Sequence, residues 1–495
     1  MKVKAAIVMR EDSGSMKPTN LVLIMSDEHN PRALGCAGHA SVKTPHLDRL
    51  VARGTYFPDA HCNSPICVPS RASFATGRYV HAIRFWDNGN PYDGSVRGWG
   101  HRLIETGHRS VSIGKLHYRC ADDANGFDPE IMPLHVVDGI GDLLGMLRRP
   151  APVRTACRKL AQDLGPGESS YAGYDRRITQ AAKDWLRDVA PTCEKPWVLF
   201  VSLVCPHFPL IAPQAFYDLY PPDSLALPER RDGAAHPFYD AMRRCMPYDE
   251  GFPDDATRRR ALANYYGMVS FVDDNVGQIL AAIDANGLGP TTRVIYTADH
   301  GDNLGTRGLW GKSTMYYESA GVPLIMAGPD IAHGRVCRTP VTLVDVCPTI
   351  LECVGEAAAA SEPARPGRSL FALADGADAD RTVLCEYHAV GATTGAFMLR
   401  HGRWKYVHFV GLPPQLFDVV ADPLEARDLA GDARHAAVLA DCEARLRAIC
   451  DPDAIDRLAF ADQEAVVARH GGRDAVLRRG TFGHSPVPGE TAVYA

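Results

Sequence analysis

The sequence has no long apolar run, no long block of like charges and no pair of cysteines with C-x-x-C spacing. A helix that crosses a membrane needs about 20 consecutive apolar residues, and no segment approaches that length. A protein that binds nucleic acid normally carries a basic patch or stripe, whereas the net charge here is -6. We therefore expect neither a membrane partner nor a nucleic-acid partner.

A secretory signal is also not recognisable. Residues 1–18 begin with basic side chains, but their apolar stretch covers only residues 5–9 and is followed directly by charges. The apolar core of a secretory signal has roughly 7–15 residues. We interpret residues 1–19 as a frayed leader and expect a cytoplasmic protein, in which most of the 14 cysteines are reduced and buried.

The apolar residues that are present occur in short runs. Five runs are rich in strand-forming residues: 21–25, 111–113, 197–203, 293–297 and 322–326. They alternate with helical stretches such as residues 257–286. This alternation predicts an α/β fold, in which a large, mostly parallel sheet is covered by helices on both faces.

A chain of 495 residues exceeds the usual size of one hydrophobic core. We expect a catalytic domain at residues 20–380, a smaller C-terminal α+β subdomain at residues 381–479 and an irregular tail at residues 480–495. Within the subdomain, residues 395–409 predict a hairpin that turns at residues 401–402. Residues 432–450 have the spacing of one amphipathic helix.

Ionisable residues follow four of the predicted strands: Asp27 and Glu28, Lys115 and His117, His207, and Asp299 and His300. In open parallel sheets, ligands bind beyond the carboxyl ends of the strands. The four loops therefore predict one shared functional site.

The segment CVPSRASFATGR, residues 67–78, predicts the start of a helix, because Pro69 suits the first turn and Gly77 suits the end. A cysteine at this place, Cys67, lies among unpaired N–H groups in a positive field. The same field favours an anionic substrate, and Arg71 adds a fixed cation about one turn later. The alternative is a buried cysteine that precedes an ordinary helix.

The pattern C-x-P-S-R-x4-T-G in this segment is the signature of the type I sulfatases, which belong to the alkaline phosphatase superfamily. Residues 297–312, TADHGDNLGTRGLWGK, resemble a metal motif of the branch that contains choline sulfatases and phosphonate monoester hydrolases. The resemblance spans roughly residues 20–432. It implies that a maturation enzyme oxidises Cys67 to formylglycine, whose hydrated aldehyde attacks the sulfur of a sulfate ester.

The resemblance also implies one divalent metal ion, held by Asp27, Cys67 (as formylglycine), Asp299 and His300. Oxygen ligands suit calcium, but a histidine ligand also admits manganese. Glu28 departs from the family, in which Asp or Gln is common at this position. Its carboxylate could bind the metal directly or lie behind the ligands, and both possibilities stay open.

Further roles follow from the same resemblance. Lys115, in the G-K-x-H motif, would stabilise charge on the sulfuryl oxygens, and His117 would hold or deprotonate the formylglycine hydroxyl. His207 and Lys312 could provide a proton or a cation to the leaving group. Asn88 matches an asparagine that contacts substrate in phosphonate monoester hydrolases.

The alcohol portion of the substrate is not determined by these motifs. Glu386 lies where choline-sulfatase-like enzymes carry a glutamate beside the pocket, but it could equally be a strand residue paired with a neighbour. An aromatic cage for a quaternary ammonium is not evident between Phe127 and Tyr171, which makes choline sulfate a doubtful substrate. We expect residues 126–173 to shape the pocket.

The leading hypothesis is therefore a sulfuric ester hydrolase that acts on a small-molecule sulfate ester. The second is a phosphonate monoester or phosphodiester hydrolase on the same scaffold, or an enzyme that accepts both. Those enzymes typically replace the G-K-x-H pair with neutral hydroxyl residues, so Lys115 and His117 favour sulfate. An inactive scaffold protein would lack catalytic positions, and a two-metal phosphatase would need a Ser or Thr nucleophile. Relatives are commonly dimers or tetramers, and we expect a homo-oligomer.

Overall fold

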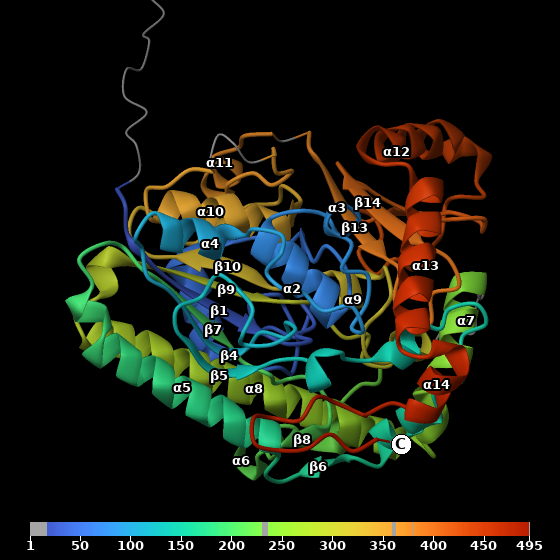
Figure 1. Cartoon of the computed structure of the whole chain (residues 1–495), viewed down its shortest axis with the longest axis horizontal. Helices are drawn as coiled ribbons and strands as arrows, with labels where there is room; N and C mark the ends of the chain where they lie inside the picture. The colour runs from blue at the N-terminus through green and yellow to red at the C-terminus, as the bar shows by residue number, and fades with distance from the viewer. Residues whose placement is uncertain (1–16, 230–235, 359–362, 379, 495) are drawn as a thin grey trace, which may run out of the picture.

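An eight-stranded sheet forms the centre of the computed structural model, which describes residues 17–229, 236–358, 363–378 and 380–494 (Figure 1). The strand order is β11-β2-β10-β9-β1-β7-β4-β5. The strands are β1 (Asn20–Ser26), β2 (Gly54–Tyr56), β4 (Ser110–Lys115), β5 (Glu130–Leu134), β7 (Val198–Ser202), β9 (Thr292–Ala298), β10 (Leu324–Ala327) and β11 (Arg335–Val336). The pairs β9–β1, β1–β7, β7–β4 and β4–β5 are parallel, whereas β10 is antiparallel to both of its neighbours. The predicted mostly parallel sheet is confirmed, and each of the five apolar runs coincides with a strand.

Helices cover both faces of this sheet (Figure 1). One face carries α1 (Pro45–Ala52), α5 (Ser170–Asp188) and α8 (Asp255–Ala285), and the other carries α2 (Cys67–Thr76), α4 (Trp99–Glu105) and α10 (Val346–Cys353). Further helices are α3 (Val80–Ile83), α6 (Gln214–Tyr217), α7 (Pro237–Cys245), α9 (Tyr317–Ala320) and α11 (Leu370–Ala374). Two-stranded pairings add β3 (Ala60–His61) with β12 (Val341–Thr342), and β6 (Leu164–Pro166) with β8 (Leu210–Ala212).

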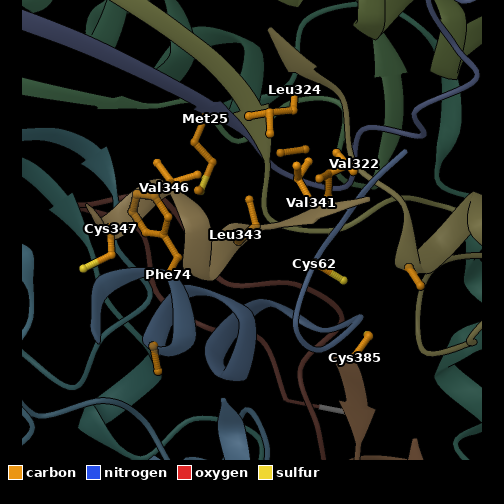
Figure 2. Packing of buried hydrophobic residues seen from close by; sticks show 14 of the residues in the cluster. Met25, Cys62, Phe74, Val322, Leu324, Val341, Leu343, Val346, Cys347 and Cys385 are labelled. Atoms are coloured by element: carbon orange, nitrogen blue, oxygen red, sulfur yellow. The ribbon is translucent and has the colours of Figure 1, made fainter. Parts of the chain in front are cut away.

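The alternation of side chains along β1 explains why this strand is apolar throughout. Leu21, Leu23 and Met25 belong to the core on the α2 side, whereas Val22 and Ile24 belong to the core on the α8 side. A strand that is buried on both faces has no solvent-facing positions for polar residues. Figure 2 shows part of the first core, in which Phe74 of α2 lies beside Val346 and Cys347 of α10.

The C-terminal part contains a second, four-stranded antiparallel sheet. Its strands are β13 (Thr382–Tyr387), β14 (Ala396–His401), β15 (Trp404–Phe409) and β16 (Gln415–Asp418). The predicted hairpin is confirmed as β14–β15, but its turn is formed by Gly402 and Arg403, one residue later than predicted, because His401 still pairs with Trp404. Cys385 of β13 packs in the same core as Cys62 near the main sheet (Figure 2), and the predicted boundary near residue 380 stays a prediction.

The sequence predicted one helix after this sheet, and the structure has three. The predicted helix is α12 (Ala436–Ile449), and it is followed by α13 (Pro452–Arg469) and α14 (Gly472–Arg479). Residues 481–494 contain an isolated bridge between Phe482 and Tyr494 but no described helix or strand. Of the predicted leader, residues 1–16 lie outside the described residues. Among the described helices, none is long and apolar enough to cross a membrane.

Candidate active site and metal centre

The carboxyl ends of four adjacent parallel strands deliver the ionisable residues to one place. Asp27 directly follows β1, Lys115 ends β4, His207 lies beyond β7, and Asp299 with His300 directly follows β9. These strands are neighbours in the order β9-β1-β7-β4. The sheet therefore brings together residues that are up to 273 positions apart in the sequence, from Asp27 to His300.

Helix α2 brings Cys67 to the same place as its first residue. The helix ends at Gly77, as the sequence predicted; this residue adopts a left-handed conformation (φ 65°) and donates its backbone N–H to the carbonyl of Ser73 at 2.8 Å. All ten residues of α2 are buried. At the other end, the side-chain oxygen of Asn88 accepts a hydrogen bond from the backbone N–H of Val68 at 3.0 Å. Asn88 therefore satisfies one of the N–H groups that a helix start leaves unpaired.

Four ligand atoms converge on one point, and the four residues that carry them are buried. The ligand atoms of Asp27, Cys67, Asp299 and His300 all lie within 4.8 Å of one another. Nε2 of His300 lies 3.2 Å from Sγ of Cys67, 3.8 Å from Oδ1 of Asp27 and 3.7 Å from Oδ1 of Asp299. Two carboxylate oxygens and an imidazole nitrogen suit a hard divalent cation, and oxidation of Cys67 to formylglycine would add an oxygen at position 67. This set therefore fits a metal ion.

Arg71 and Lys115 hold the remaining carboxylate oxygens. The guanidinium of Arg71 donates to Oδ2 of Asp299 at 2.8 Å and to Oδ2 of Asp27 at 3.2 Å, and the ammonium of Lys115 also pairs with Oδ2 of Asp27. Burial would raise the pKa of Asp27, but the charges of Lys115 and Arg71 help to lower it well below its usual value. Asp27 is therefore an ionised ligand at neutral pH.

The thiol of Cys67 is not activated by its position at the helix start. Burial, followed by the charge of Asp27, raises its pKa to about 12. These effects outweigh the positive field that the sequence indicated. An unmodified cysteine would therefore be a neutral thiol at neutral pH, and only the thiolate is a good nucleophile.

A second group of side chains lies on the other side of Cys67. The ammonium of Lys312 lies 3.2 Å from Sγ of Cys67, 2.8 Å from Nε2 of His207 and 3.1 Å from Oε2 of Glu28. Burial works against the charge of Lys312, but nearby acidic groups, among them the carboxylates of Asp27 and Asp299, raise its pKa well above the usual value. For His207, burial and the charge of Lys312 lower the pKa well below the usual value. The pair is therefore an ammonium and a neutral imidazole.

A cavity of about 430 Å³ opens beside these groups. Its lining includes Cys67, Asn88, Lys115, His117, His207, Tyr171 and Lys312. Nε2 of His117 lies 2.9 Å from Oγ of Ser485, and burial together with the charge of Lys115 lowers the pKa of His117 well below the usual value. The C-terminal segment that contributes Ser485 had no recognisable motif and was predicted only as an irregular tail.

Two positions named from the sequence lie elsewhere. Glu386 is fully buried and is not part of the cavity lining described above, because its carboxylate pairs with His81 at 2.9 Å and with His388 at 3.1 Å. This is the arrangement of a paired strand residue, the alternative that the sequence left open. Phe127 packs against Trp99 in the core, so it does not form a cage with Tyr171.

Comparisons with known proteins agree with this geometry. The family described as "Sulfatase" matches residues 19–356, and the one described as "N-sulphoglucosamine sulphohydrolase, C-terminal" matches residues 305–451. A choline-sulfatase of Rhizobium meliloti is 30% identical over 430 residues, which are 84% of this chain and 83% of that protein. Arylsulfatase K of Danio rerio is 27% identical over 465 residues, 88% of this chain and 85% of that protein.

Among solved structures, the phosphonate monoester hydrolase of Agrobacterium radiobacter matches with a TM-score of 0.70 and 22% identity, over 87% of this chain and 95% of that one. At this identity the likeness supports the fold alone. The family match covers more than half of the chain, and the choline-sulfatase aligns over most of it. The chain therefore belongs to the sulfatase family and is a sulfuric ester hydrolase.

Proposed function

We propose that this enzyme hydrolyses small-molecule sulfate monoesters in the cavity beside Cys67, with one calcium or manganese ion held by Asp27, Asp299, His300 and the modified residue 67. The observation that carries the proposal is the convergence of these four ligand atoms within 4.8 Å. The cationic side chains Arg71, Lys115 and Lys312 surround the same point.

The family uses formylglycine and a divalent metal ion. When both are present, they supply a hydroxyl nucleophile at neutral pH and neutralise charge on the ester oxygens. The two Oδ1 atoms of Asp27 and Asp299 lie toward His300 and position 67, while both Oδ2 atoms are bound to Arg71. The two Oδ1 atoms therefore face the proposed ion, and Oδ1 of Asp299 also accepts hydrogen bonds from the backbone N–H groups of Glu28 at 3.2 Å and His300 at 3.0 Å.

The chain's own side chains bind and polarise the ester. Lys115 lies at the cavity wall and places a positive charge where the sulfuryl oxygens collect charge. Lys312 is protonated at neutral pH, because its pKa is raised, and its ammonium lies 3.2 Å from Sγ of Cys67. It is therefore the group placed to protonate the leaving alcohol. His207 is neutral and accepts a hydrogen bond from Lys312, so we assign it to orienting that ammonium.

A phosphonate monoester or a phosphodiester is the second candidate, because such esters also carry an anionic centre with a leaving alcohol. Lys115 and His117 both line the cavity. Their presence supports the sulfate ester as the preferred substrate, since the phosphonate hydrolases typically have neutral hydroxyl residues here. An enzyme that accepts both ester classes is also compatible with the cavity.

The decisive experiment compares kcat/KM for an aryl sulfate, an aryl phosphonate monoester and a phosphodiester with the same leaving group. We expect the sulfate to be hydrolysed fastest, and a dominant phosphonate rate would contradict the proposal. Cys67→Ala should abolish turnover of all three esters and leave the circular dichroism spectrum unchanged. Turnover retained by that variant would refute the role of residue 67.

Three further expectations belong to this proposal. A formylglycine-generating enzyme must act on Cys67 before the chain is active, which mass spectrometry of the peptide containing residue 67 would detect. The homo-oligomeric state, a dimer or a tetramer, stays a prediction for sedimentation analysis. The cytoplasmic location likewise stays a prediction.

A further inference from the structure

The C-terminal segment, residues 481–494, returns from α14 to the active-site cavity (Figure 1). Most of its residues line that cavity. Its start is fixed by Arg154, which donates a hydrogen bond to Oγ1 of Thr481 at 2.6 Å. Its end folds back on its beginning, since Phe482 pairs with Tyr494 and their ring centroids lie 5.7 Å apart. The segment is therefore anchored on the catalytic domain by side-chain contacts.

Ser485 makes two hydrogen bonds that tie this segment to the site. Its side-chain oxygen is 2.9 Å from Nε2 of His117, and its carbonyl accepts a hydrogen bond from the hydroxyl of Tyr171 at 2.7 Å. Ser485 is 7% exposed, His117 is 6% exposed and Tyr171 is 2% exposed. The serine is thus held from α5 on one side and contacts the catalytic histidine on the other.

His117 has little else to fix its ring. Its Nδ1 atom is buried and has no hydrogen-bond partner among the described residues. Its backbone adopts a left-handed conformation (φ 60°), and the backbone N–H is bound to the carbonyl of Leu134 at 2.8 Å. The main chain is therefore fixed, whereas the contact with Ser485 is the hydrogen bond that sets the rotation of the ring.

We propose that Ser485 is a positioning residue for His117, and that the C-terminal segment thereby forms a working part of the active site. This inference rests on the proposed function, together with the role that the family resemblance implies for His117, which is to hold or deprotonate the formylglycine hydroxyl. A small misplacement of a catalytic group can cost about 100-fold in rate. Because the contact orients His117 and does not bind the ester, its loss should lower kcat and leave KM nearly unchanged.

The test uses the full-length, formylglycine-containing enzyme and whichever of the three esters it hydrolyses fastest. Ser485→Ala should lower kcat by about 10- to 100-fold and change KM by less than about twofold. If His117 acts after the alcohol has left, KM should instead fall in proportion to kcat, and this variant should release the first equivalent of alcohol in a burst before a slower steady state. Ser485→Thr keeps a hydroxyl and should recover kcat to within about threefold of the unaltered enzyme.

Ser224→Ala, at an exposed position in another part of the chain, is the matched control and should leave kcat unchanged. The proposal is overturned if Ser485→Ala keeps the kcat of the unaltered enzyme, or if Ser485→Thr loses as much as Ser485→Ala. Should Ser485→Ala fail to fold, Tyr171→Phe gives a second measurement, because it removes the bond to the carbonyl of Ser485 and keeps the serine hydroxyl. It should lower kcat several-fold, and an unchanged kcat would overturn the proposal.

These results separate the two ideas. A preference for a phosphonate ester would refute the assignment to sulfate and would leave the role of Ser485 standing. Equal kcat in Ser485→Ala and the unaltered enzyme would refute the role of Ser485 and would leave the assignment to sulfate standing.

Discussion

The ammonium of Lys312 donates a hydrogen bond to Nε2 of His207 across 2.8 Å. Nδ1 of His207 lies 2.7 Å from the carbonyl oxygen of Phe208. A neutral imidazole carries one N–H group, and the carbonyl can only accept, so the proton is on Nδ1. Nε2 is then an acceptor, and Lys312 is the partner that carries a proton beside Cys67.

We therefore predict that Lys312→Met affects esters with poor leaving groups most. Loss of a positioned acid costs about 100- to 10,000-fold, so kcat/KM should fall by that amount for sulfates of weakly acidic alcohols. The loss should be much smaller for 4-nitrophenyl sulfate, whose leaving group needs no proton. The measurement is the dependence of log kcat/KM on the leaving-group pKa, which should become steeper in the variant.

The matched control for this variant is Lys159→Met, which removes an exposed lysine from the rim of the same cavity. It should leave the leaving-group dependence unchanged. A slope that is equal in the Lys312 variant and the unaltered enzyme would show that Lys312 does not act on the leaving group.

A second prediction concerns the guanidinium that bridges two metal ligands. Arg71→Lys keeps the positive charge but lacks the planar guanidinium, whose separate N–H groups bind Asp27 and Asp299 at the same time. Residues that orient metal ligands typically change metal affinity by about 10- to 100-fold when they are mutated. We expect a loss of this size, measured as bound metal per chain after dialysis against graded concentrations of chelator.

Arg403→Lys, in an exposed ion pair with Asp418, is the control for this experiment and should retain metal like the unaltered enzyme. If the Arg71 variant retains as much metal as the unaltered enzyme, the carboxylates of Asp27 and Asp299 keep their orientation without the guanidinium.

A third prediction separates two roles of Asn88. Its side-chain oxygen binds the N–H of Val68 at the start of α2, and loss of such a contact typically costs about 1 kcal/mol. Asn88→Ala should therefore lower the free energy of unfolding by about that amount. Asn88→Asp keeps the accepting oxygen and should remain stable, but it loses the amide donor and adds a negative charge, so KM for an anionic ester should rise. An unchanged KM would mean that Asn88 stabilises the start of α2 and does not contact the ester.

The sequence predicted those parts of the site that depend on local patterns and strand ends. Asp27, Lys115 and Asp299 each lie where a short apolar run stops, and parallel pairing is enough to bring such positions together. Helix α2 was predicted from Pro69 and Gly77, whose positional preferences are local. The catalytic roles of these residues stay predictions until variants are measured.

The remaining features depend on contacts between distant segments. Ser485 has no sequence signal, because a serine in an irregular segment is common and its partner His117 is 368 positions away. Glu386 illustrates the opposite case, in which a resemblance to a relative's pocket residue gave no information about its partners His81 and His388. The high pKa of Cys67 arises from burial, which a helix position alone does not reveal.

The last prediction addresses the open role of Glu28. Burial raises its pKa from a usual value of 4.5 to about 8, even though Lys312 works in the opposite direction. Its Oε1 atom has no hydrogen-bond partner among the described residues. Without metal, the folded protein therefore keeps this proton at pH values where the unfolded chain has lost it. Because the folded state binds more protons, the contribution of Glu28 to the free energy of unfolding decreases as the pH rises from about 4.5 to about 8.

Glu28→Gln keeps the shape of the side chain and removes the titration. In chelator-treated samples, the free energy of unfolding of the unaltered protein, relative to that of the variant, should fall with pH at up to about 1.4 kcal/mol per pH unit in this range. Urea unfolding at several pH values measures this difference, and parallel pH profiles would contradict the raised pKa. Repeating the series with saturating calcium tests the ligand question. A direct metal ligand must be ionised, and a nearby cation also lowers the pKa of a carboxyl group that does not bind it, so a slope that persists would exclude Glu28 as a ligand.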